Sequence, residues 1–479
     1  MIKFGTGGWR SIIGEDFTKA NIQKLAKAVS LKMKNEGVTD NGIVIGYDRR
    51  FLSKEAMQWA GVIFAWEGIT TYLINRSSPT PLIMYYVMKH RLHYGMMVTA
   101  SHNPAIYNGI KVFTYGGRDA DEIQTRDIEN YINDVKEEEV IGMDYDDAKN
   151  QRLILEINPL NEYLDNIIST IDMTSIRNRG LRVALDPMYG VSETSLRTIL
   201  LTARCDVYTI HERHDTLFGG KLPSPSAATL RSLINRVLDL RCDIGIATDG
   251  DADRIGVIDD TGRFLHPNDI LVLLYYYLVR FKNWHGPVVR NLATTHILDR
   301  LAEKFGEKCY EVPVGFKYIS AKMNETNAII GGESSGGLTV HGHINGKDGI
   351  YAAALLIEMM AVTGKKLSEI MKDIEEEFGT IHMEERDYSF TQEKKSEIHR
   401  MLLMDKLLPG LPFEIDKVSY LDGCKVYFKN GGWIIARFSG TEPLLRIFCE
   451  MPAAEDAVRL CEIYEDFLSL LEQKVIMVR

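Results

Sequence analysis

The stretch Asp243-Ile244-Gly245-Ile246-Ala247-Thr248-Asp249 is a short apolar run that ends in an aspartate. Two earlier runs, residues 43–49 and 181–186, have the same form and bring Asp48 and Asp186 to their ends. Runs of this length and composition are typical of strands that are buried on both faces. Functional sites in open α/β sheets lie at the carboxyl ends of the strands. The three runs therefore predict repeated α/β units with polar groups at one edge of each sheet.

The segments between these runs have the spacing of helices. In residues 18–36 apolar side chains recur every three or four positions, and Gly37 is suited to end the helix. Alternation of strands with such helices is typical of α/β architecture. The same reasoning predicts helices at 53–66, 81–92, 127–139, 269–281, 296–305 and 348–378, the last interrupted at Gly364, and strands at 70–74 and 287–291.

The pattern changes after residue 378. Residues 420–428 and 433–437 flank Asn430-Gly431-Gly432, which is a hairpin signal, and a strand at 444–450 precedes a helix at 454–472. A smaller α+β domain is the expected result. At about 150 residues per domain, we expect α/β domains at 1–150, 151–261 and 262–378 and an α+β domain at 379–479.

Composition restricts the classes of partner. The chain has 479 residues, 45% hydrophobic and 25% charged, as in ordinary soluble globular proteins. No signal peptide is recognised, and the longest apolar run, residues 270–279, is too short to cross a bilayer, so we expect a cytoplasmic protein without a membrane partner. A net charge of −10 without a basic tract argues against nucleic acid and requires local cations for any anionic substrate. The six cysteines lack CxxC spacing, which argues against structural zinc.

Three carboxylates alternate in the turn that follows the third run: Asp249, Asp251 and Asp253. Carboxylates this close repel one another, and a hard divalent cation is the simplest way to stabilise them. Oxygen ligands favour magnesium, calcium or manganese over zinc. An EF-hand has the same initial spacing, but Arg254 replaces its glycine, Asp260 replaces its glutamate, and strands replace its helices. The alternative, an acidic surface turn, fits poorly with the apolar flanks.

A second polar turn, Thr99-Ala100-Ser101-His102-Asn103-Pro104, follows the apolar residues 94–98. The Asn-Pro pair ends regular structure and leaves Ser101 at the tip, where it is a candidate nucleophile. Read alone, the turn favours a structural role, in which Ser101 and Asn103 cap the backbone. The prediction of a metal site in the carboxylate turn favours the other interpretation, in which Ser101 is a nucleophile that works beside a metal.

Further clusters contain groups that suit sugars or phosphates. Glycines precede Arg10 in residues 4–10, and the glycine-rich residues 331–337 offer Glu333 and Ser335 to sugar hydroxyls. The first stretch is also explained as a hairpin turn and the second as a flexible turn.

Residues 437–443 offer Arg437 and two hydroxyls in a turn suited to a phosphate dianion. Lys317 is either a second cation or a solvated surface residue. His343 is either a structural histidine or an acid or base that works near pH 7.

Four motifs occur in the order and at the separations of a known family. They are Thr-Ala-Ser-His-Asn-Pro at 99–104, Asp-Gly-Asp-Ala-Asp-Arg at 249–254, Gly-Glu-x-Ser at 332–335 and Arg-x-Ser-Gly-Thr-Glu-Pro at 437–443. Over essentially its whole length the chain resembles the α-D-phosphohexomutase superfamily, the phosphoglucomutases and phosphomannomutases. The resemblance implies three tandem related α/β domains plus a C-terminal α+β domain around a central cleft.

The resemblance also implies roles for individual residues. Ser101 would carry a phosphoryl group and would hold Mg²⁺ together with Asp249, Asp251 and Asp253. The other implied roles are acid and base for Lys111 and His343, support of the transferring phosphoryl group for Arg10 and Arg254, binding of sugar hydroxyls for Glu333 and Ser335, and binding of the second phosphate for Arg437, Ser439, Gly440 and Thr441, with Lys317 as a further cation.

The implied reaction interconverts hexose 1-phosphate and hexose 6-phosphate through glucose 1,6-bisphosphate, which is both intermediate and activator. His-Ile-x-x-Lys-Asp-Gly at 343–349 and Gly-Phe-Lys-Tyr at 315–318 resemble the glucomutase type, so we expect glucose and also mannose. The chain departs from common family patterns at Gly8, Gly337 and Gly440. The alternatives are a phosphoglucosamine mutase, a phosphopentomutase, a magnesium-dependent sugar phosphatase with Asp249 as nucleophile, and a non-catalytic sugar-phosphate module. We expect a monomer or dimer.

Overall fold

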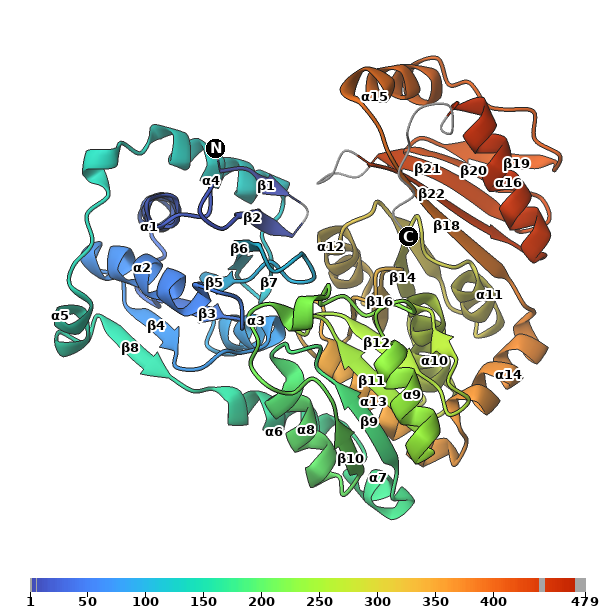
Figure 1. Ribbon diagram of the computed structural model, residues 1–479, viewed down its shortest axis with the longest axis horizontal. Helices are drawn as coiled ribbons and strands as arrows, with labels where there is room; N and C mark the ends of the chain where they lie inside the picture. The colour runs from blue at the N-terminus through green and yellow to red at the C-terminus, as the bar shows by residue number, and fades with distance from the viewer. Residues whose placement is uncertain (1, 6, 439–443, 470–479) are drawn as a thin grey trace.

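The chain folds into four units, each built around its own sheet. The computed structural model describes residues 2–5, 7–438 and 444–469, and within them the strands form four sheets that follow one another along the sequence. Figure 1 shows the first unit on one side, the second and third packed beside it, and the C-terminal unit next to the third and apart from the first. The prediction of three α/β domains followed by an α+β domain is confirmed.

The first unit contains an eight-stranded sheet. Thr18 caps its first helix and Gly37, at φ 67°, ends that helix, as the sequence predicts. Its strands are β1 Phe4–Gly5, β2 Gly8–Ile12, β3 Ile43–Tyr47, β4 Thr71–Ile74, β5 Tyr94–Val98, β6 Tyr107–Thr114, β7 Arg118–Asp119 and β8 Ile154–Ile157. Its helices are α1 Lys19–Glu36, α2 Ser53–Trp66, α3 Thr80–Lys89, α4 Glu122–Asp134 and α5 Tyr145–Asn150, with a 3-10 turn at Glu137–Glu139.

Strand β8 pairs in parallel with β4, so residues after 150 still belong to this first sheet. The helix expected at 127–139 is α4, which begins earlier because Asp121 caps it, and which ends at Asp134. The acidic residues 137–139 form the separate 3-10 turn.

The second and third units have smaller sheets. The second contains β9 Arg182–Asp186, β10 Asp206–Thr209, β11 Ile244–Thr248, β12 Ile255–Ile258 and β13 Phe264–Leu265, with α6 Leu160–Thr170, α7 Met173–Arg179, α8 Ser192–Thr202, the turn η2 Phe218–Gly220 and α9 Arg231–Leu240. The third contains β14 Val288–Asn291, β15 Cys309–Val312, β16 Ile330–Gly332 and β17 Leu338–Val340, with α10 Pro267–Arg280, α11 Ile297–Lys304, α12 Phe316–Thr326, α13 Gly349–Thr363 and α14 Leu367–Phe378.

The fourth unit is an antiparallel sheet in the order β18-β22-β21-β20-β19. These strands are β18 His382–Ser389, β19 Ile415–Ser419, β20 Cys424–Phe428, β21 Trp433–Phe438 and β22 Leu444–Met451, accompanied by α15 Gln392–His399, the π-turn η3 Arg400–Met404 and α16 Ala454–Phe467. The single strand predicted at 420–428 is shorter, because residues 420–423 form the connection from β19 to β20.

The three α/β units repeat one strand arrangement. Their sheets contain the orders β4-β3-β5-β6, β10-β9-β11-β12 and β15-β14-β16-β17, in which the first three strands are parallel and the fourth is antiparallel. Within this repeat, Asp48 follows β3 and Asp186 ends β9, which are the first strands in sequence, whereas Asp249 follows β11, the third. The turns after the third strands hold Ser101, Asp249 and Glu333, so the repeat places these three residues at equivalent positions.

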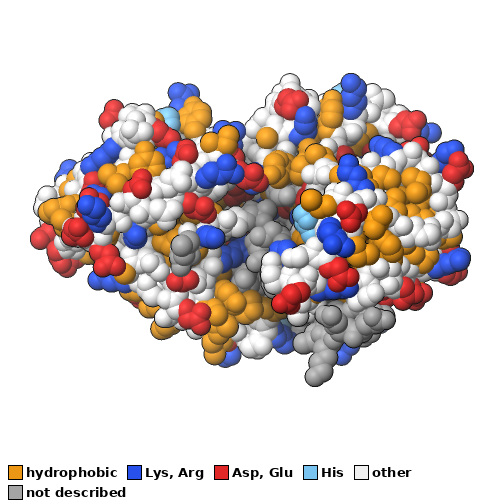
Figure 2. Space-filling view, turned by 90° about the horizontal axis from the view of Figure 1, so that it is seen from above, with side chains coloured by type: hydrophobic (Ala, Val, Ile, Leu, Met, Phe, Trp, Pro, Cys, Tyr) orange, Lys and Arg blue, Asp and Glu red, His pale blue; other side chains and the backbone are white. Residues whose placement is uncertain are grey.

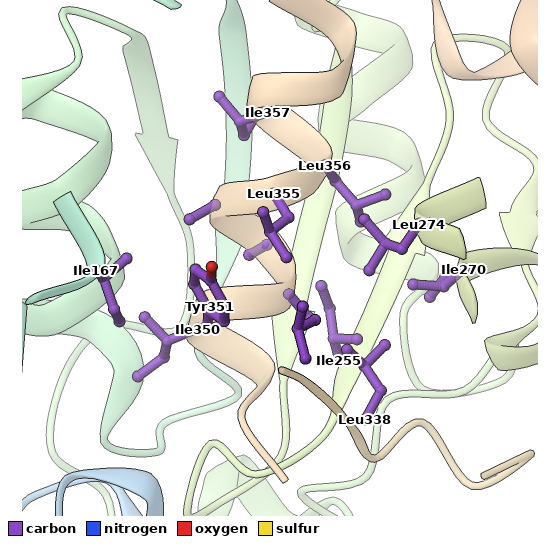
Figure 3. Packing of buried hydrophobic residues seen from close by; sticks show 14 of the residues in the cluster. Ile167, Ile255, Ile270, Leu274, Leu338, Ile350, Tyr351, Leu355, Leu356 and Ile357 are labelled. Atoms are coloured by element: carbon purple, nitrogen blue, oxygen red, sulfur yellow. The ribbon is translucent and has the colours of Figure 1, made fainter. Parts of the chain in front are cut away.

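Helix α13 joins the second and third units into one body. Its residues from Gly349 to Met360 are all buried, which is typical of a helix surrounded by protein. Figure 3 shows Ile350, Tyr351 and Leu356 on different faces of the helix, packed toward Ile167 on one side and Leu274 on the other. These side chains belong to a hydrophobic cluster that also reaches the first unit. The strand ends of these units are therefore held in fixed relation. Among the described residues, no helix combines the length and apolar character needed to span a membrane.

Candidate active site

Ser101 lies against the carboxylate turn of the next unit. Its side chain is fully buried, and Oγ donates a hydrogen bond to Asp249 Oδ2 at 2.7 Å. Its φ of 49° is left-handed, a strained conformation for a serine. The close approach also needs a glycine, because a Cβ on Gly250 would lie 2.8 Å from the carbonyl oxygen of Ser101. The first two units thus meet at this serine.

Asp249, Asp251 and Asp253 form a compact, buried carboxylate cluster. One oxygen from each lies within 4.8 Å of the others, and none of the three residues is more than 1% exposed. Asp251 Oδ1 and Asp253 Oδ1 are buried without a hydrogen-bond partner in the described structure. Burial, followed by the charges of Asp251 and Asp253, raises the pKa of Asp249 well above its usual range. A compact buried triad with two carboxylate oxygens lacking partners fits a hard, oxygen-liganded cation such as Mg²⁺.

Two lysines partly balance the three carboxylates. Lys111, on β6, donates from Nζ to Asp251 Oδ2 at 2.7 Å and to Asp253 Oδ2 at 2.6 Å. Burial alone would lower the pKa of Lys111, but the two carboxylates outweigh it and raise the pKa. Lys347 Nζ lies 3.0 Å from Asp253 Oδ2. The sequence alone indicates no role for Lys347, because its contact depends on the loop before α13 meeting the second unit.

Two guanidinium groups lie beside the serine turn. Arg10, on β2, donates from Nη1 to Asn103 Oδ1 at 2.6 Å. Arg254 Nε is buried without a hydrogen-bond partner among the described residues and lies 4.0 Å from Asp253 Oδ1. Burial, then the charge of Arg254, lowers the pKa of Arg10, and burial with both arginines holds the pKa of His102 well below its usual range. Positive groups that repel one another in this way suit a phosphate dianion.

Glu333 extends the same row of strand ends into the third unit. It is 9% exposed, and its Oε1 accepts hydrogen bonds from Asn291 Nδ2 at 3.4 Å and from the Gly315 backbone N at 3.2 Å. Ser335 Oγ donates to Oε2 at 3.3 Å. The carboxylate is therefore oriented on a loop between two strands, as a group that recognises hydroxyls must be. Figure 2 shows the surface hollowed between the first unit and the rest, with Lys and Arg side chains along the hollow.

Two of the sequence-predicted residues, His343 and Lys317, have partners outside the carboxylate cluster in the described structure. His343 Nε2 is 2.6 Å from Asp348 Oδ2, which also accepts a hydrogen bond from Tyr163 at 2.7 Å. Its ring therefore belongs to the network at the start of α13, without a contact to the carboxylate cluster. Lys317 Nζ donates to Glu122 Oε1 at 2.8 Å and so joins the third unit to α4 of the first.

In the C-terminal unit, Arg437 Nη2 lies 3.3 Å from Asp422 Oδ2, which accepts a hydrogen bond from the Val314 backbone N at 3.0 Å. Arg437 is thus placed beside the loop that leads to Lys317. Ser439, Gly440 and Thr441, the other residues predicted to hold phosphate, lie outside the described residues.

Three repeated α/β units that bring a serine, a carboxylate triad and paired guanidiniums to adjoining strand ends define a phosphohexomutase fold and site. Family comparison agrees. Residues 1–139, 161–262 and 266–378 match the phosphoglucomutase/phosphomannomutase alpha/beta/alpha domains I, II and III, and residues 410–466 match the C-terminal domain of the same family.

Full-length relatives give the same result. A phosphoglucomutase/phosphomannomutase of Thermococcus kodakarensis is 29% identical over 462 residues, covering 96% of this chain and 97% of its own. A protein of Methanosarcina acetivorans named as a probable phosphoglucosamine mutase is 31% identical over 474 residues, covering 97% of this chain and 98% of its own. The crystal structure of a Thermus thermophilus protein named as a phosphomannomutase is 29% identical, with a TM-score of 0.84 over 98% of this chain and 99% of its own. The chain belongs to the phosphoglucomutase/phosphomannomutase family of the α-D-phosphohexomutase superfamily. Its members are isomerases that transfer a phosphoryl group intramolecularly.

Proposed function

We propose that the protein interconverts hexose 1-phosphate and hexose 6-phosphate through a phosphorylated Ser101 and a hexose 1,6-bisphosphate. The observation that carries the proposal is the hydrogen bond from Ser101 Oγ to Asp249, within a carboxylate triad and beside Arg10 and Arg254. Glucose is the first candidate hexose and mannose the second. Relatives named for glucose, mannose and glucosamine phosphates make glucosamine the principal alternative.

In the first proposed step a hydroxyl oxygen of the bound hexose phosphate attacks the phosphorus carried by Ser101. The bond from phosphorus to Ser101 Oγ breaks, a bond to the sugar oxygen forms, and the hydroxyl proton passes to a base of the site. The bisphosphate then turns over, and the other phosphoryl group returns to Ser101 as its sugar oxygen regains a proton. Arg10 and Arg254 hold the phosphoryl oxygens during transfer.

The phosphohexomutase family depends on magnesium, and the donors present fit that ion. Ser101, Asp249, Asp251 and Asp253 would hold Mg²⁺, which supplies positive charge to the transferring phosphoryl group. Glu333 and Ser335 would bind sugar hydroxyls. Arg437 with the turn at 439–441, and Lys317 when released from Glu122, would bind the phosphate that is not transferred.

Intact mass spectrometry tests the proposal directly. The purified protein, after incubation with glucose 1,6-bisphosphate, should gain the mass of one phosphoryl group, and Ser101→Ala should neither gain it nor convert glucose 1-phosphate into glucose 6-phosphate. Full turnover by Ser101→Ala would exclude the mutase mechanism, and free phosphate as the main product would favour the phosphatase. Rates on the 1-phosphates of glucose, mannose, glucosamine and ribose then rank the substrates.

Two variants can identify which residue acts as the base. Lys111 is charged beside the triad and is suited to return a proton, whereas the partner base is either His343, as the resemblance implies, or Lys347, which the structure places on Asp253. Loss of general base catalysis lowers kcat by about 10²–10⁴-fold. We expect Lys347→Met to lower kcat in that range and His343→Gln to lower it less than tenfold. The reverse order would assign the base to His343.

A further inference from the structure

Arg50 is a buried arginine that donates hydrogen bonds to four backbone carbonyl oxygens in and just after the turn that contains Ser101. Its side chain has no exposed surface. Nη2 donates to the carbonyl oxygens of Ser101 at 2.7 Å and Asn103 at 2.6 Å, and Nη1 donates to those of Pro104 at 2.8 Å and Tyr107 at 2.9 Å. One planar guanidinium therefore fixes the turn from Ser101 to its exit into β6, which a flexible point charge cannot do.

Asp48 links Arg50 to the other side of Ser101. Its carboxylate lies 3.4 Å from Arg50 Nε and accepts hydrogen bonds from Thr99 Oγ1 at 2.7 Å and Ser53 Oγ at 2.8 Å. Thr99 Oγ1 in turn accepts a hydrogen bond from the backbone N of Ser101 at 2.8 Å. The charge pair thus holds Ser101 at both its amide nitrogen and its carbonyl oxygen.

The held residue is the strained one. Ser101 has a φ of 49°, and such a conformation persists when its surroundings over-determine it. A buried ion pair contributes little net stability compared with apolar packing of the same volume. The four hydrogen bonds of Arg50 therefore contribute more to the orientation of Ser101 than to the stability of the fold.

Contacts of a similar kind support the equivalent turn in the other two units. Asn291, the last residue of β14, donates to Glu333 Oε1, and in the loop after β9 the backbone N of Val191 donates to the Gly250 carbonyl oxygen at 3.3 Å. In all three units, the central parallel strand or the loop that follows it contacts the turn after its neighbouring parallel strand. The arrangement around Arg50 is the charged version of a repeated architectural contact.

We propose that Arg50 and Asp48 are positioning residues for phosphoryl transfer: through Thr99 and four backbone carbonyl oxygens they fix the conformation in which Ser101 Oγ accepts and donates the phosphoryl group. The inference rests on the proposed function. Among the described residues, Arg50 and Asp48 contact neither the sugar loop of Glu333 nor Arg437, so the orientation of Ser101 is their route to the reaction.

Single-turnover kinetics of the phosphorylated full-length protein test the inference. Arg50→Lys keeps the charge but cannot span four carbonyl oxygens, and a misplacement of about 1 Å costs about 100-fold in rate. We expect transfer from phosphorylated Ser101 to glucose 1-phosphate to slow about 100-fold. The dissociation constant of glucose 1-phosphate for the unphosphorylated protein should change less than about twofold. Arg386→Lys, which loses ion pairs to Glu384 and Glu465 in the C-terminal unit, is the control for lost stability and should transfer at the wild-type rate.

A second pair of variants decides the matter if Arg50→Lys fails to fold. Thr99→Val removes the hydroxyl between Asp48 and the Ser101 amide, whereas Thr99→Ser keeps it, so the serine variant should recover the transfer rate that the valine variant loses. Transfer within threefold of wild type in Arg50→Lys, or equal rates in Thr99→Val and Thr99→Ser, would overturn the inference. A wild-type protein that never gains a phosphoryl group on Ser101 would instead refute the proposed function.

Discussion

At the scale of single residues, the three buried carboxylates of Asp249, Asp251 and Asp253 repel one another in the folded protein. Two neighbouring lysines offset part of this repulsion. Lys111 and Lys347 bond to one oxygen of Asp251 and one of Asp253, and the other oxygen of each stays without a hydrogen bond in the described structure. An uncompensated buried carboxylate is strongly unfavourable. Binding of a divalent cation should therefore raise the free energy of unfolding.

We predict that Mg²⁺ stabilises the protein and that Asp251→Asn weakens the effect. At a concentration 100 times the dissociation constant, binding to the folded state raises the free energy of unfolding by about 2.7 kcal/mol. Thermal unfolding with Mg²⁺ and with EDTA measures the difference, which should fall by more than half in Asp251→Asn. Asp239→Asn, an equal charge change at an exposed site on α9, should keep it. Equal midpoints of the wild-type protein in both solutions would contradict the prediction.

Residues in compact sequence motifs could be predicted, and residues that act across units could not. Ser101 and the three aspartates stand in two short turns whose composition is visible in the sequence, and the structure brings them together. Lys347 and Arg50 gave no such signal, because a lone cation in a loop has many explanations until its partner is known. His343 shows the opposite case, because its motif suggested a catalytic role. Although it lies only four residues from Lys347, which contacts the carboxylate cluster, it pairs with Asp348, the cap of α13.

At the scale of elements, the start of α13 depends on one carboxylate with several partners. Asp348 Oδ1 accepts hydrogen bonds from the backbone N atoms of Ile350 and Tyr351, both at 2.9 Å, while its Oδ2 serves His343 and Tyr163. Burial, followed by the Asp348 charge, raises the pKa of Tyr163 well above its usual range, so the phenol remains a donor. Asp348 thus begins a buried helix and satisfies two buried side chains.

We predict that Asp348→Ala destabilises the protein by about 3 kcal/mol, whereas Asp121→Ala costs about 1 kcal/mol. Both aspartates cap helices, which is worth about 1 kcal/mol, but Asp121 is exposed and its loss strands no buried donor. Loss of Asp348 leaves His343 and Tyr163 unpaired, at about 1–3 kcal/mol in total. Urea unfolding of the two variants measures the difference. Equal costs would show that water or neighbouring groups replace the lost partner.

Element types followed from sequence where periodicity was strong. The predicted helix at 53–66 is α2, and the hairpin around Asn430-Gly431-Gly432 joins β20 to β21. Short strands such as β1 and β8 carry too few residues for a pattern, and β8 joins the first sheet through a pairing about 80 residues distant in sequence. The order of strands within a sheet depends on such long-range contacts. The threefold repeat of strand order therefore became visible in the structure and not in the sequence.

At the scale of the whole molecule, contacts between units decide how the site is assembled. The C-terminal unit meets the third unit through Lys425, whose side chain is 1% exposed. Its Nζ donates to the Leu292 carbonyl oxygen at 2.7 Å and lies 2.7 Å from Glu311 Oε2 and 3.1 Å from His296 Nε2. Apolar side chains that include Trp433 surround this contact. The junction is thus a polar contact sealed from water, and its protonation state affects how firmly the C-terminal unit docks.

Burial, then the charge of Arg290, lowers the pKa of Lys425 to about 7, although Glu311 opposes the shift. Burial and the charge of Arg290 also lower the pKa of His296 to about 3, so this imidazole is neutral. In the unfolded chain Lys425 has its ordinary pKa, so between pH 7 and about 10.5 the unfolded state binds more protons than the folded state. The contribution of Lys425 to the free energy of unfolding therefore rises with pH across this window.

We predict that the difference in unfolding free energy between the wild-type protein and Lys425→Met grows by about 2 kcal/mol from pH 7 to pH 9, because other titrating groups cancel in the difference. Urea unfolding followed by tryptophan fluorescence measures it, since Trp433 lies in the junction. Lys429→Met, which removes an exposed lysine paired with Glu414 just beyond β20, should show no such growth. A difference that stays flat from pH 7 to pH 9 would mean that Lys425 remains an ammonium in the folded protein. The third and fourth units would then be joined by a permanent ion pair, and docking of the C-terminal unit would not respond to pH in this range.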